Sequence, residues 1–220
     1  MLGFGLGLGG QSIPPAVISI PNSISSYVFD LDVTQSASYG GSGQTWSNLI
    51  ESPADGSAKI AYDVYLGADG NASTDDPVFN GTAGSSAAYW SSDGSDFLKM
   101  KTLPTLLADA HKGQASNKWW LAFAFKTAPS MCLFSTYDDV NTRGIYLFTD
   151  GNNRVAAEFY NSTQFKPTRQ SIAASTNSVV IFSYSYSDAK FRYWVNSRTA
   201  VEVSSTLAGT ESLSGISGAD

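Results

Sequence analysis

From residue 27 onward, apolar and polar residues alternate in short runs, and turn-forming residues separate the runs. A period of two is the pattern of a strand with one buried face. Short strands of this kind, with almost no helical periodicity, predict an all-β sandwich or barrel. The predicted strands are 27–32, 58–66, 97–100, 119–127, 131–136, 144–149, 155–160, 179–186, 191–195 and 200–204, with turn signals at 93–94, 150–153 and 196–197.

The chain is long enough for one large domain. Of its 220 residues, 42% are hydrophobic and 13% aromatic, which is sufficient apolar material for a single sizeable core. We find no internal repeat, and Leu103–His111 is the one segment with a short helical pattern. We therefore predict an N-terminal arm and linker over residues 1–26 and a single β-sandwich over residues 27–220.

The first ten residues place a large apolar residue at every second position, with glycine between. In an extended chain this puts all large side chains on one face and bare backbone on the other. Glycine is costly to order, so the segment is a weak strand alone and gains most from a partner that covers it. Two interpretations stay open, a flexible tail or an assembly arm that inserts into a neighbouring subunit. The arm residues are Leu2, Phe4, Leu6 and Leu8.

Charge and apolar content argue against several classes of partner. The net charge is −6, and no window of five residues is dominated by Lys or Arg, so we expect no nucleic-acid binding. We expect no membrane partner either, because no apolar run approaches ~18 residues. The N-terminus lacks the basic start of a secretion signal. The single cysteine, Cys132, lies in an apolar run and is predicted to be a buried, inert thiol.

The residues that support catalysis are scarce, so we predict that the protein is not an enzyme. The chain has four glutamates and one histidine. A glycosidase needs two carboxylates facing one cleft, but Asp138 and Asp139 are adjacent and would point to opposite faces of a strand. His111 follows the possible helix and is predicted to interact with its C-terminal carbonyls. No His or Cys cluster matches a zinc site.

One loop has the first half of a calcium-binding pattern. Its oxygen side chains occupy alternate positions, as in an EF-hand loop, but the sixth position is Thr74 rather than glycine and the twelfth is Asn80 rather than glutamate. A solvated turn is the other interpretation. The candidate calcium ligands are Asp69, Asn71, Ser73 and Asp75.

Aromatic residues and one polar loop are the candidates for sugar binding. Each of the five tryptophans is expected to pack in the core, and of the neighbours Trp119 and Trp120 one should point inward. The loop that joins the strands 131–136 and 144–149 is both aromatic and polar, so it is the best rim site, with a plain connection as the alternative. The candidate ligand-binding residues are Tyr137, Asp138, Asp139, Asn141 and Arg143.

Four segments, read in order, resemble the concanavalin A-like (laminin-G-like) jelly-roll domain of bacterial and bacteriophage surface proteins. The resemblance covers roughly residues 27–207. Asn48 stands where that family often has aspartate, and Ser197 replaces the glycine of a late turn. The segments are Phe29–Asp32 with Tyr39–Leu49, Tyr89–Leu98, Trp119–Thr127, and Val180–Tyr184 with Arg192–Asn196.

The resemblance implies a two-sheet antiparallel jelly-roll sandwich. The extended glycine-rich N-terminal arm is absent from ordinary lectin domains of this family and resembles instead the opening of bacteriophage virion proteins. It also implies a bacteriophage virion structural protein, in a tail, fibre or capsid surface, whose lectin-like domain serves assembly or host-surface glycan binding. Expected partners are further copies of the chain, other virion proteins and a glycan, and the resemblance to phage fibres implies a trimer. Calcium is a candidate ion because laminin-G-like domains often bind it. The family's closing strand pair is absent, so we expect a partner to cover the open sheet edge. The alternative is a carbohydrate-binding module of a bacterial surface or secreted protein.

Overall fold

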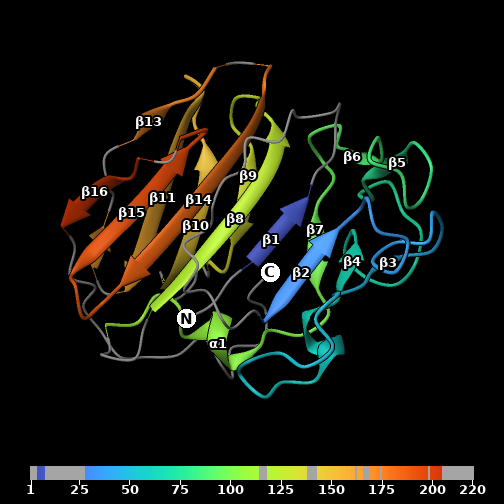
Figure 1. The fold of residues 1–220 in the computed structure, drawn as a ribbon, viewed down its shortest axis with the longest axis horizontal. Helices are drawn as coiled ribbons and strands as arrows, with labels where there is room; N and C mark the ends of the chain where they lie inside the picture. Colours follow the sequence, from blue (N-terminus) through green and yellow to red (C-terminus); the bar gives the residue numbers. More distant parts are fainter. Residues whose placement is uncertain are drawn as a thin grey trace. The chain divides into compact units, whose positions relative to one another are not determined.

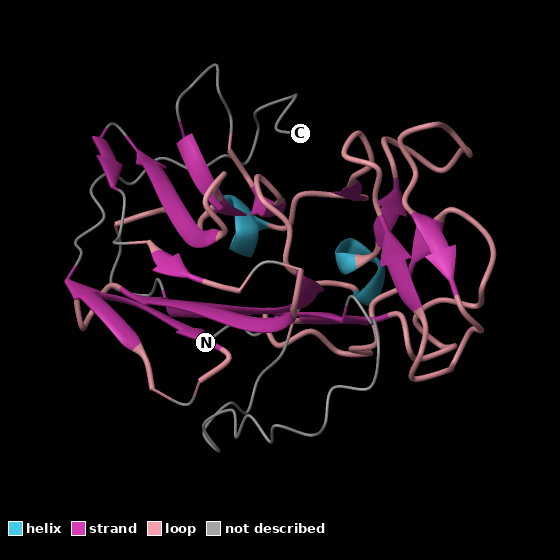
Figure 2. Cartoon of the chain, turned by 90° about the horizontal axis from the view of Figure 1, so that it is seen from above, coloured by secondary structure: helices cyan, strands magenta, loops and turns pink. Residues whose placement is uncertain are grey.

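A computed structural model describes the backbone of most of the chain. The described residues are 4–7, 28–113, 118–137, 143–161, 163–165, 169–173, 175–197 and 199–204. Within them, helix is confined to the 3₁₀ turn η1 (Lys59–Tyr62) and to α1 (Thr105–Ala108), so strands and loops dominate (Figure 2). This confirms the all-β prediction and is compatible with a sandwich. Over the same residues, no helix has the length and apolar character to cross a membrane.

The chain divides into two compact units. Unit 1 comprises Met1–Thr102 and Ala122–Lys126, and unit 2 comprises Leu103–Leu121 and Thr127–Asp220. The strand β8 (Lys118–Lys126) is therefore shared, its first residues belonging to unit 2 and its last to unit 1. Residues 8–27, which contain the predicted boundary after residue 26, lie outside the described part, so that boundary stays a prediction.

Unit 2 contains two sheets of long strands (Figure 1). The first has the order β12-β11-β10-β9, and β13 also pairs with β11. The second has the order β16-β15-β14-β8. The pairs β9–β10, β10–β11, β11–β12, β11–β13, β14–β15 and β15–β16 are antiparallel. The bounds are β9 Cys132–Ser135, β10 Arg143–Thr149, β11 Arg154–Asn161, β12 Thr163–Phe165, β13 Gln170–Ser171, β14 Asn177–Ser185, β15 Lys190–Val195 and β16 Val201–Ser204.

Aromatic rings join the two sheets of unit 2. The ring of Phe159 on β11 lies 6.0 Å from that of Trp119, 6.0 Å from that of Tyr184 and 5.2 Å from that of Phe191. All four side chains are at most 1% exposed. Rings at such separations contribute packing energy beyond the apolar area they bury. The inward faces of the sheets in unit 2 therefore form a common core.

Unit 1 is built from shorter strands. The strand β1 (Phe4–Gly7) pairs in parallel with β2 (Phe29–Asp32) and with β8. Two small antiparallel sheets follow, with the orders β3-β4-β7 and β5-β6. Their strands are β3 Thr45–Trp46, β4 Val64–Leu66, β7 Leu98–Met100, β5 Val78–Asn80 and β6 Tyr89–Ser91. The parallel pairs of β1 depart from the predicted purely antiparallel arrangement, because a long link can connect parallel neighbours as a hairpin cannot.

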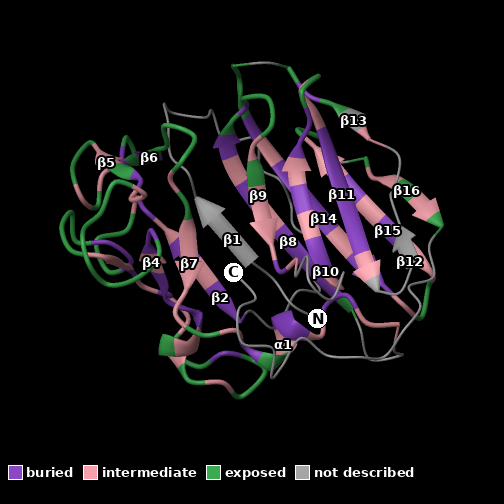
Figure 3. Cartoon of the chain, turned by 180° about the vertical axis from the view of Figure 1, so that it is seen from behind, coloured by how far each residue is buried: buried purple, intermediate pink, exposed green. Residues whose placement is uncertain are grey.

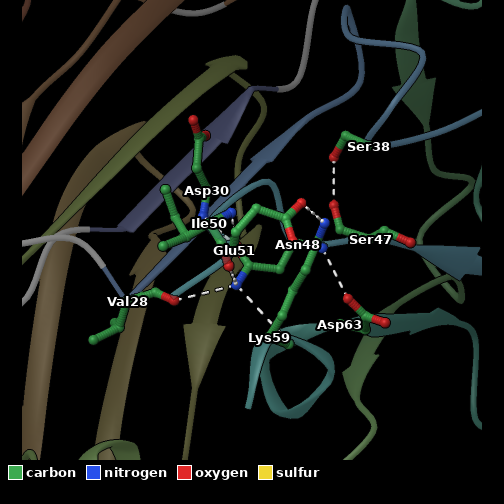
Figure 4. A network of polar contacts seen from close by, with 9 residues as sticks. All are labelled: Val28, Asp30, Ser38, Ser47, Asn48, Ile50, Glu51, Lys59 and Asp63. Carbon is green, nitrogen blue, oxygen red and sulfur yellow. Dashed lines mark hydrogen bonds and ion pairs between the residues drawn. The ribbon is translucent and has the colours of Figure 1, made fainter. Parts of the chain in front are cut away.

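Asn48 organises the loops of unit 1 (Figure 4). Its Oδ1 accepts hydrogen bonds from the backbone N–H groups of Asp30, at 2.8 Å, and Ile50, at 3.1 Å. Its Nδ2 donates to the carbonyls of Val28, at 3.2 Å, and Ile50, at 3.3 Å. Its own N–H donates to Oδ1 of Asp63 at 2.9 Å. Asn48 is completely buried, so this amide supplies partners that solvent cannot reach.

The predicted strand 58–66 is wrong in its first half. Lys59–Tyr62 form η1, and only Val64–Leu66 form a strand, β4. The hydroxyl of Tyr62 donates to Oδ2 of Asp55 at 2.6 Å, and Ile60 is left 62% exposed. A local side-chain contact and the resulting turn therefore replace strand pairing for the first half of the alternating run.

Candidate ligand-binding face

The predicted rim loop between β9 and β10 is described only at its two ends. Tyr137 closes the β9 side, and its ring lies 4.3 Å from that of Tyr160 on β11. Arg143 is the first residue of β10 and pairs with Asn161. Asp138, Asp139 and Asn141 lie outside the described residues, so their part in a ligand site stays a prediction.

The base of this loop is held by a close approach of two backbones. Thr136 N–H donates to the carbonyl of Ile145 at 2.9 Å, and Ile145 N–H donates to Oγ1 of Thr136 at 3.1 Å. Gly144 between them has φ +116°, and a Cβ built there would lie 2.2 Å from the carbonyl oxygen of Thr136. Glycine is therefore required at this position, and it holds Tyr137 close to the end of β10.

The outward face of β10 and β11 carries aromatic and charged side chains. Along β10, Ile145, Leu147 and Thr149 are fully buried, whereas Tyr146 and Phe148 between them are only half-buried, an alternation visible in Figure 3. The rings of Tyr146 and Phe148 stack at 4.5 Å with an interplanar angle of 16°. Tyr146 pairs with Glu158 across to β11, and directly paired residues share a face, so Glu158 and Tyr160 lie on this side of the sheet as well, although Glu158 itself is buried, at 7% exposed.

A cluster of ion pairs lies beside these rings. Oδ2 of Asp150 is 2.8 Å from Nε of Arg154 and 2.9 Å from Nη1 of Arg169. Its Oδ1 accepts the backbone N–H groups of Asn152, at 2.9 Å, and Arg154, at 3.0 Å. Hydrogen bonds from these donors, those of Arg154 first, hold the pKa of Asp150 well below its usual range against the cost of desolvation. The carboxylate is therefore charged at any physiological pH.

Arg169 connects the ion pairs to the rings. Its Nη2 lies 3.6 Å from Oε1 of Glu158, and its guanidinium carbon lies 5.6 Å from the ring centre of Phe148. Glu158 also accepts a hydrogen bond from the hydroxyl of Tyr160. A guanidinium in this position gains from both carboxylate pairing and the aromatic face beneath it.

We call this set the aromatic–ionic face. Its aromatic members present planar apolar surface, and its charged members are fixed by one another rather than free to rotate. Planar rings beside a few oriented polar groups are the usual composition of a site for a small polar ligand. The face consists of Tyr137, Tyr146, Phe148, Asp150, Arg154, Glu158, Tyr160 and Arg169.

The tryptophans predicted as core residues are buried, with one exception. Trp46, Trp90, Trp119 and Trp120 are all buried, and Trp194 is half-buried. Trp119 and Trp120 are both inside, although strand alternation predicted one outside.

Cys132, predicted to be buried, is exposed, because it begins β9 and pairs with the outward Phe148. His111 was predicted to interact with the C-terminal carbonyls of a helix. It follows the end of α1 (Thr105–Ala108) in the chain and is fully buried.

The predicted calcium loop uses most of its oxygens internally. Oδ1 of Asp69 accepts the N–H of Asn71 at 2.7 Å and its Nδ2 at 2.9 Å. Oδ2 of Asp75 accepts the N–H of Ala68 at 2.9 Å. The N–H of Ser73 donates to Asp76 at 2.8 Å. These bonds describe a turn that stabilises itself, which is the alternative interpretation of the pattern.

Two carboxylate oxygens near this loop have no hydrogen-bond partner among the described residues. They are Oδ1 of Asp75 and Oδ1 of Asp76, and a Cβ built on Gly67 would lie 3.1 Å from the first and 2.3 Å from the second. In the described part of the chain, no group of three or more His, Cys, Asp or Glu side chains is arranged to hold a metal. Calcium binding by Asp69, Asn71, Ser73 and Asp75 stays a prediction.

Of the predicted assembly arm, Phe4 and Leu6 belong to β1, while Leu2 and Leu8 lie outside the described residues. Apart from Tyr137, the residues of the aromatic–ionic face were not predicted, although their signal is present in the sequence as aromatic residues at alternate positions of two strands. In comparisons with known proteins, no family model, no curated protein and no solved structure matches this chain.

Proposed function

We propose that the chain is a non-enzymatic binding protein that recognises a carbohydrate through the aromatic–ionic face. The observation that carries this proposal is the stack of Tyr146 and Phe148 beside the fixed Glu158–Arg169 pair on the outward face of one sheet. The jelly-roll form of the sandwich is part of the same proposal and is supported by the sequence resemblance.

A sugar suits both kinds of surface on this face. The C–H groups on one side of a pyranose ring pack against aromatic planes, while its hydroxyl groups need donors and acceptors in fixed positions. Arg169 is about one-third exposed and offers donors that two buried carboxylates, Asp150 and Glu158, already orient. The face carries both signs of charge, which favours a neutral glycan over a strongly anionic one.

The ionisation of Asp150 argues against its acting as the acid of a hydrolase at this face. A glycosidase needs one carboxylic acid with a raised pKa to protonate the leaving group. The pKa of Asp150 is lowered instead, chiefly by hydrogen bonds from Arg154 and Arg169. The carboxylate of Glu158 is occupied by the guanidinium of Arg169 and the hydroxyl of Tyr160. These pairings support binding without catalysis.

The biological setting follows from the resemblance rather than from the face. A bacteriophage virion component with a lectin-like domain remains our first choice, and glycan binding would then serve host adhesion. A carbohydrate-binding module of a bacterial surface or secreted protein would use the same face in the same way. Virion localisation separates the two settings, and antibody labelling of purified particles would measure it.

The test is a glycan panel followed by calorimetry on any sugar that binds. Each of Tyr146→Ala and Phe148→Ala removes one stacking surface and should weaken binding about 5- to 10-fold, that is about 1 to 1.4 kcal/mol. Arg169→Gln removes the guanidinium and should weaken it further. Tyr89→Ala is the matched control, because Tyr89 is a partly exposed tyrosine on β6 in unit 1.

Two results would count against the proposal. The first is that no glycan of the panel binds at millimolar concentration. The second is that a glycan binds equally well to Tyr146→Ala, Phe148→Ala and the wild-type chain. Far-ultraviolet circular dichroism of each variant would establish that it remains folded.

A further inference from the structure

The strand β1 occupies a slot between two other strands of unit 1. It pairs with β2 from Phe4 to Gly7 and with β8 from Gly5 to Gly7, in parallel on both sides. The edges of β2 and β8 that face this slot thus depend on β1 for hydrogen bonding. Buried backbone groups need such partners, so the slot requires an extended segment.

The register defines what kind of segment fits the slot. Leu6 pairs with Leu31 and Phe123, which are 1% and 3% exposed. Gly5 and Gly7 pair with Asp30 and Asp32 on one side and with Ala122 and Ala124 on the other. Neighbouring pairs share a face of the sheet. The slot therefore favours a strand with an apolar residue opposite the buried Leu31 and Phe123. Opposite Asp30 and Asp32 it favours glycine, which has no side chain.

The connection between β1 and β2 does not decide which chain supplies the strand. Parallel neighbours cannot be joined by a tight hairpin and need a long crossover, usually a helix packed on the sheet. About 20 residues can span up to about 70 Å, whereas a four-residue strand is only about 13 Å long. The link is thus long enough for β1 to return to its own slot or to reach another molecule.

From these observations we infer that the slot between β2 and β8 accepts residues 4–7 of a second copy of this chain, so that copies associate by exchanging β1. Every backbone pair that β1 makes in its own chain is available in the exchanged form, which is why such exchange is a low-cost route to oligomers. The strand of the same chain competes at an effective concentration on the order of millimolar. Exchange therefore increases as the protein concentration approaches that range.

Single-cysteine chains test this directly in the full-length protein. In a Cys132→Ser background, one chain carries Gly5→Cys and the other carries Asp30→Cys, the two residues that the register pairs. Neighbouring strands lie about 4.8 Å apart, within the Cα separation that a disulfide bridges. The two chains are mixed across a range of concentrations, oxidised and separated by mass under non-reducing conditions.

We expect a disulfide-linked heterodimer whose yield rises with concentration and falls when a peptide of residues 1–12 is added in excess. A chain with Ser92→Cys in place of Asp30→Cys is the control, since Ser92 is exposed and lies outside the slot. The doubly substituted Gly5→Cys/Asp30→Cys chain reports the intrachain bond.

Two outcomes would overturn the inference. In the first, the double variant forms its intrachain disulfide but the heterodimer at about 1 mM never exceeds the Ser92 control, so β1 stays in its own chain. In the second, neither bond forms, so β1 does not occupy the slot. Glycan binding in unit 2 is independent of both, because all residues of the aromatic–ionic face lie outside unit 1.

Discussion

The two units are stabilised in different ways. Unit 2 has strands of up to nine residues, such as β14, and a core of closely spaced rings around Phe159. Unit 1 has antiparallel strands of two or three residues, and its loops are held by the buried amide of Asn48. Long strands bury enough apolar surface to specify their own pairing. Short strands leave that task to hydrogen bonds between side chains and backbone.

The turns show the same difference. Among the described residues, glycines with positive φ are concentrated in unit 1, at 41, 43, 56, 67, 81, 84 and 94, and only Gly144 falls in unit 2. The non-glycine residues with positive φ, which include Asn153 and Asn196, all lie in unit 2. Asparagine tolerates this conformation at a tight turn between strands. Unit 1 therefore relies on glycine where unit 2 relies on its strands to impose the turn.

The largest loss of stability should follow from removing an aromatic side chain from the core of unit 2. Trp119→Ala removes a side chain that is 1% exposed and packs on both Phe159 and Tyr184. We expect the free energy of unfolding to fall by about 3–5 kcal/mol, measured by urea denaturation. Trp119→Phe should lose less, because a ring remains. A loss below about 1 kcal/mol would show that the ring core does not stabilise unit 2.

The matching change in unit 1 is Asn48→Ala. It leaves the N–H of Asp30 and the carbonyl of Val28 without the partners they now have. Each such buried group costs about 1–3 kcal/mol, so we expect a total loss of about 3 kcal/mol. Hydrogen exchange should accelerate at residues 28–32 and 48–50 and not in the sheets of unit 2.

Asn48→Asp is the informative partner variant, because it keeps the acceptor oxygen for Asp30 but puts a second carboxylate oxygen where Nδ2 now donates to the carbonyls of Val28 and Ile50. A buried charge that faces carbonyl oxygens costs more than an unmade hydrogen bond, so this variant should be at least as unstable as Asn48→Ala. Equal exchange rates in both units after Asn48→Ala would mean that the units unfold together, and the contrast drawn above would fail.

Acid should weaken unit 2 through His111. Burial, opposed by Asp109 and reinforced by Lys112 and Arg143, lowers the pKa of His111 to about 4 from an ordinary value of 6.5. The unfolded chain therefore binds a proton that the folded chain does not, between these two values. The full free energy of unfolding is therefore present above pH 6.5 and falls as the pH is lowered toward 4. At pH 5 the loss amounts to about 2 kcal/mol.

The variant His111→Gln removes this titration. Its free energy of unfolding should depend less on pH between 4 and 6.5 than that of the wild-type chain. Urea denaturation at half-unit pH steps gives both curves. If the two curves run parallel through this window, the fully buried histidine does not make unit 2 acid-sensitive.

The strands that the sequence predicted are those whose alternation reflects a buried face. All ten predicted runs contain a strand, and the turns at Asp93-Gly94 and Asn196-Ser197 are confirmed by positive φ at Gly94 and Asn196. In β10, for example, three alternate residues are completely buried. The periodicity is local, so one sequence window suffices to detect it.

What was missed depends on contacts between distant residues. The pairing of β1 with β8 joins residues that are more than 100 positions apart, and no local pattern states such a partner. In the sequence, Asn48 is only an asparagine where the resembling family often has aspartate. Its role depends on hydrogen bonds with Val28, Asp30 and Asp63, which lie 15 to 20 positions away. Tyr146 and Phe148 on β10 acquire a charged neighbour only through Arg169, which lies outside the strand and whose guanidinium lies over the ring of Phe148. The alternation along one strand predicts which of its residues face the core. Which residues of different strands lie together depends on the register between strands, and no single stretch of sequence gives that register.

The smallest effect separates two causes of glycine dependence, one in each unit. Gly43 and Gly144 both have positive φ, at +93° and +116°, but a Cβ on Gly43 meets nothing within 4 Å, whereas one on Gly144 would lie 2.2 Å from the carbonyl of Thr136. Gly43→Ala should therefore cost only the conformational strain, about 1 kcal/mol. Gly144→Ala must in addition push β10 from Thr136, and we expect at least about 1 kcal/mol more.

Urea denaturation of the two alanine variants measures that difference, with Gly151→Ala as the control because Gly151 has neither a positive φ nor a close neighbour. The Gly144 variant should also weaken glycan binding, since the same displacement moves Tyr137 away from Tyr160. Equal losses for Gly43→Ala and Gly144→Ala would show that backbone conformation alone requires glycine in both units. A larger loss at Gly144 would show instead that unit 2 needs its glycine because two backbones meet there.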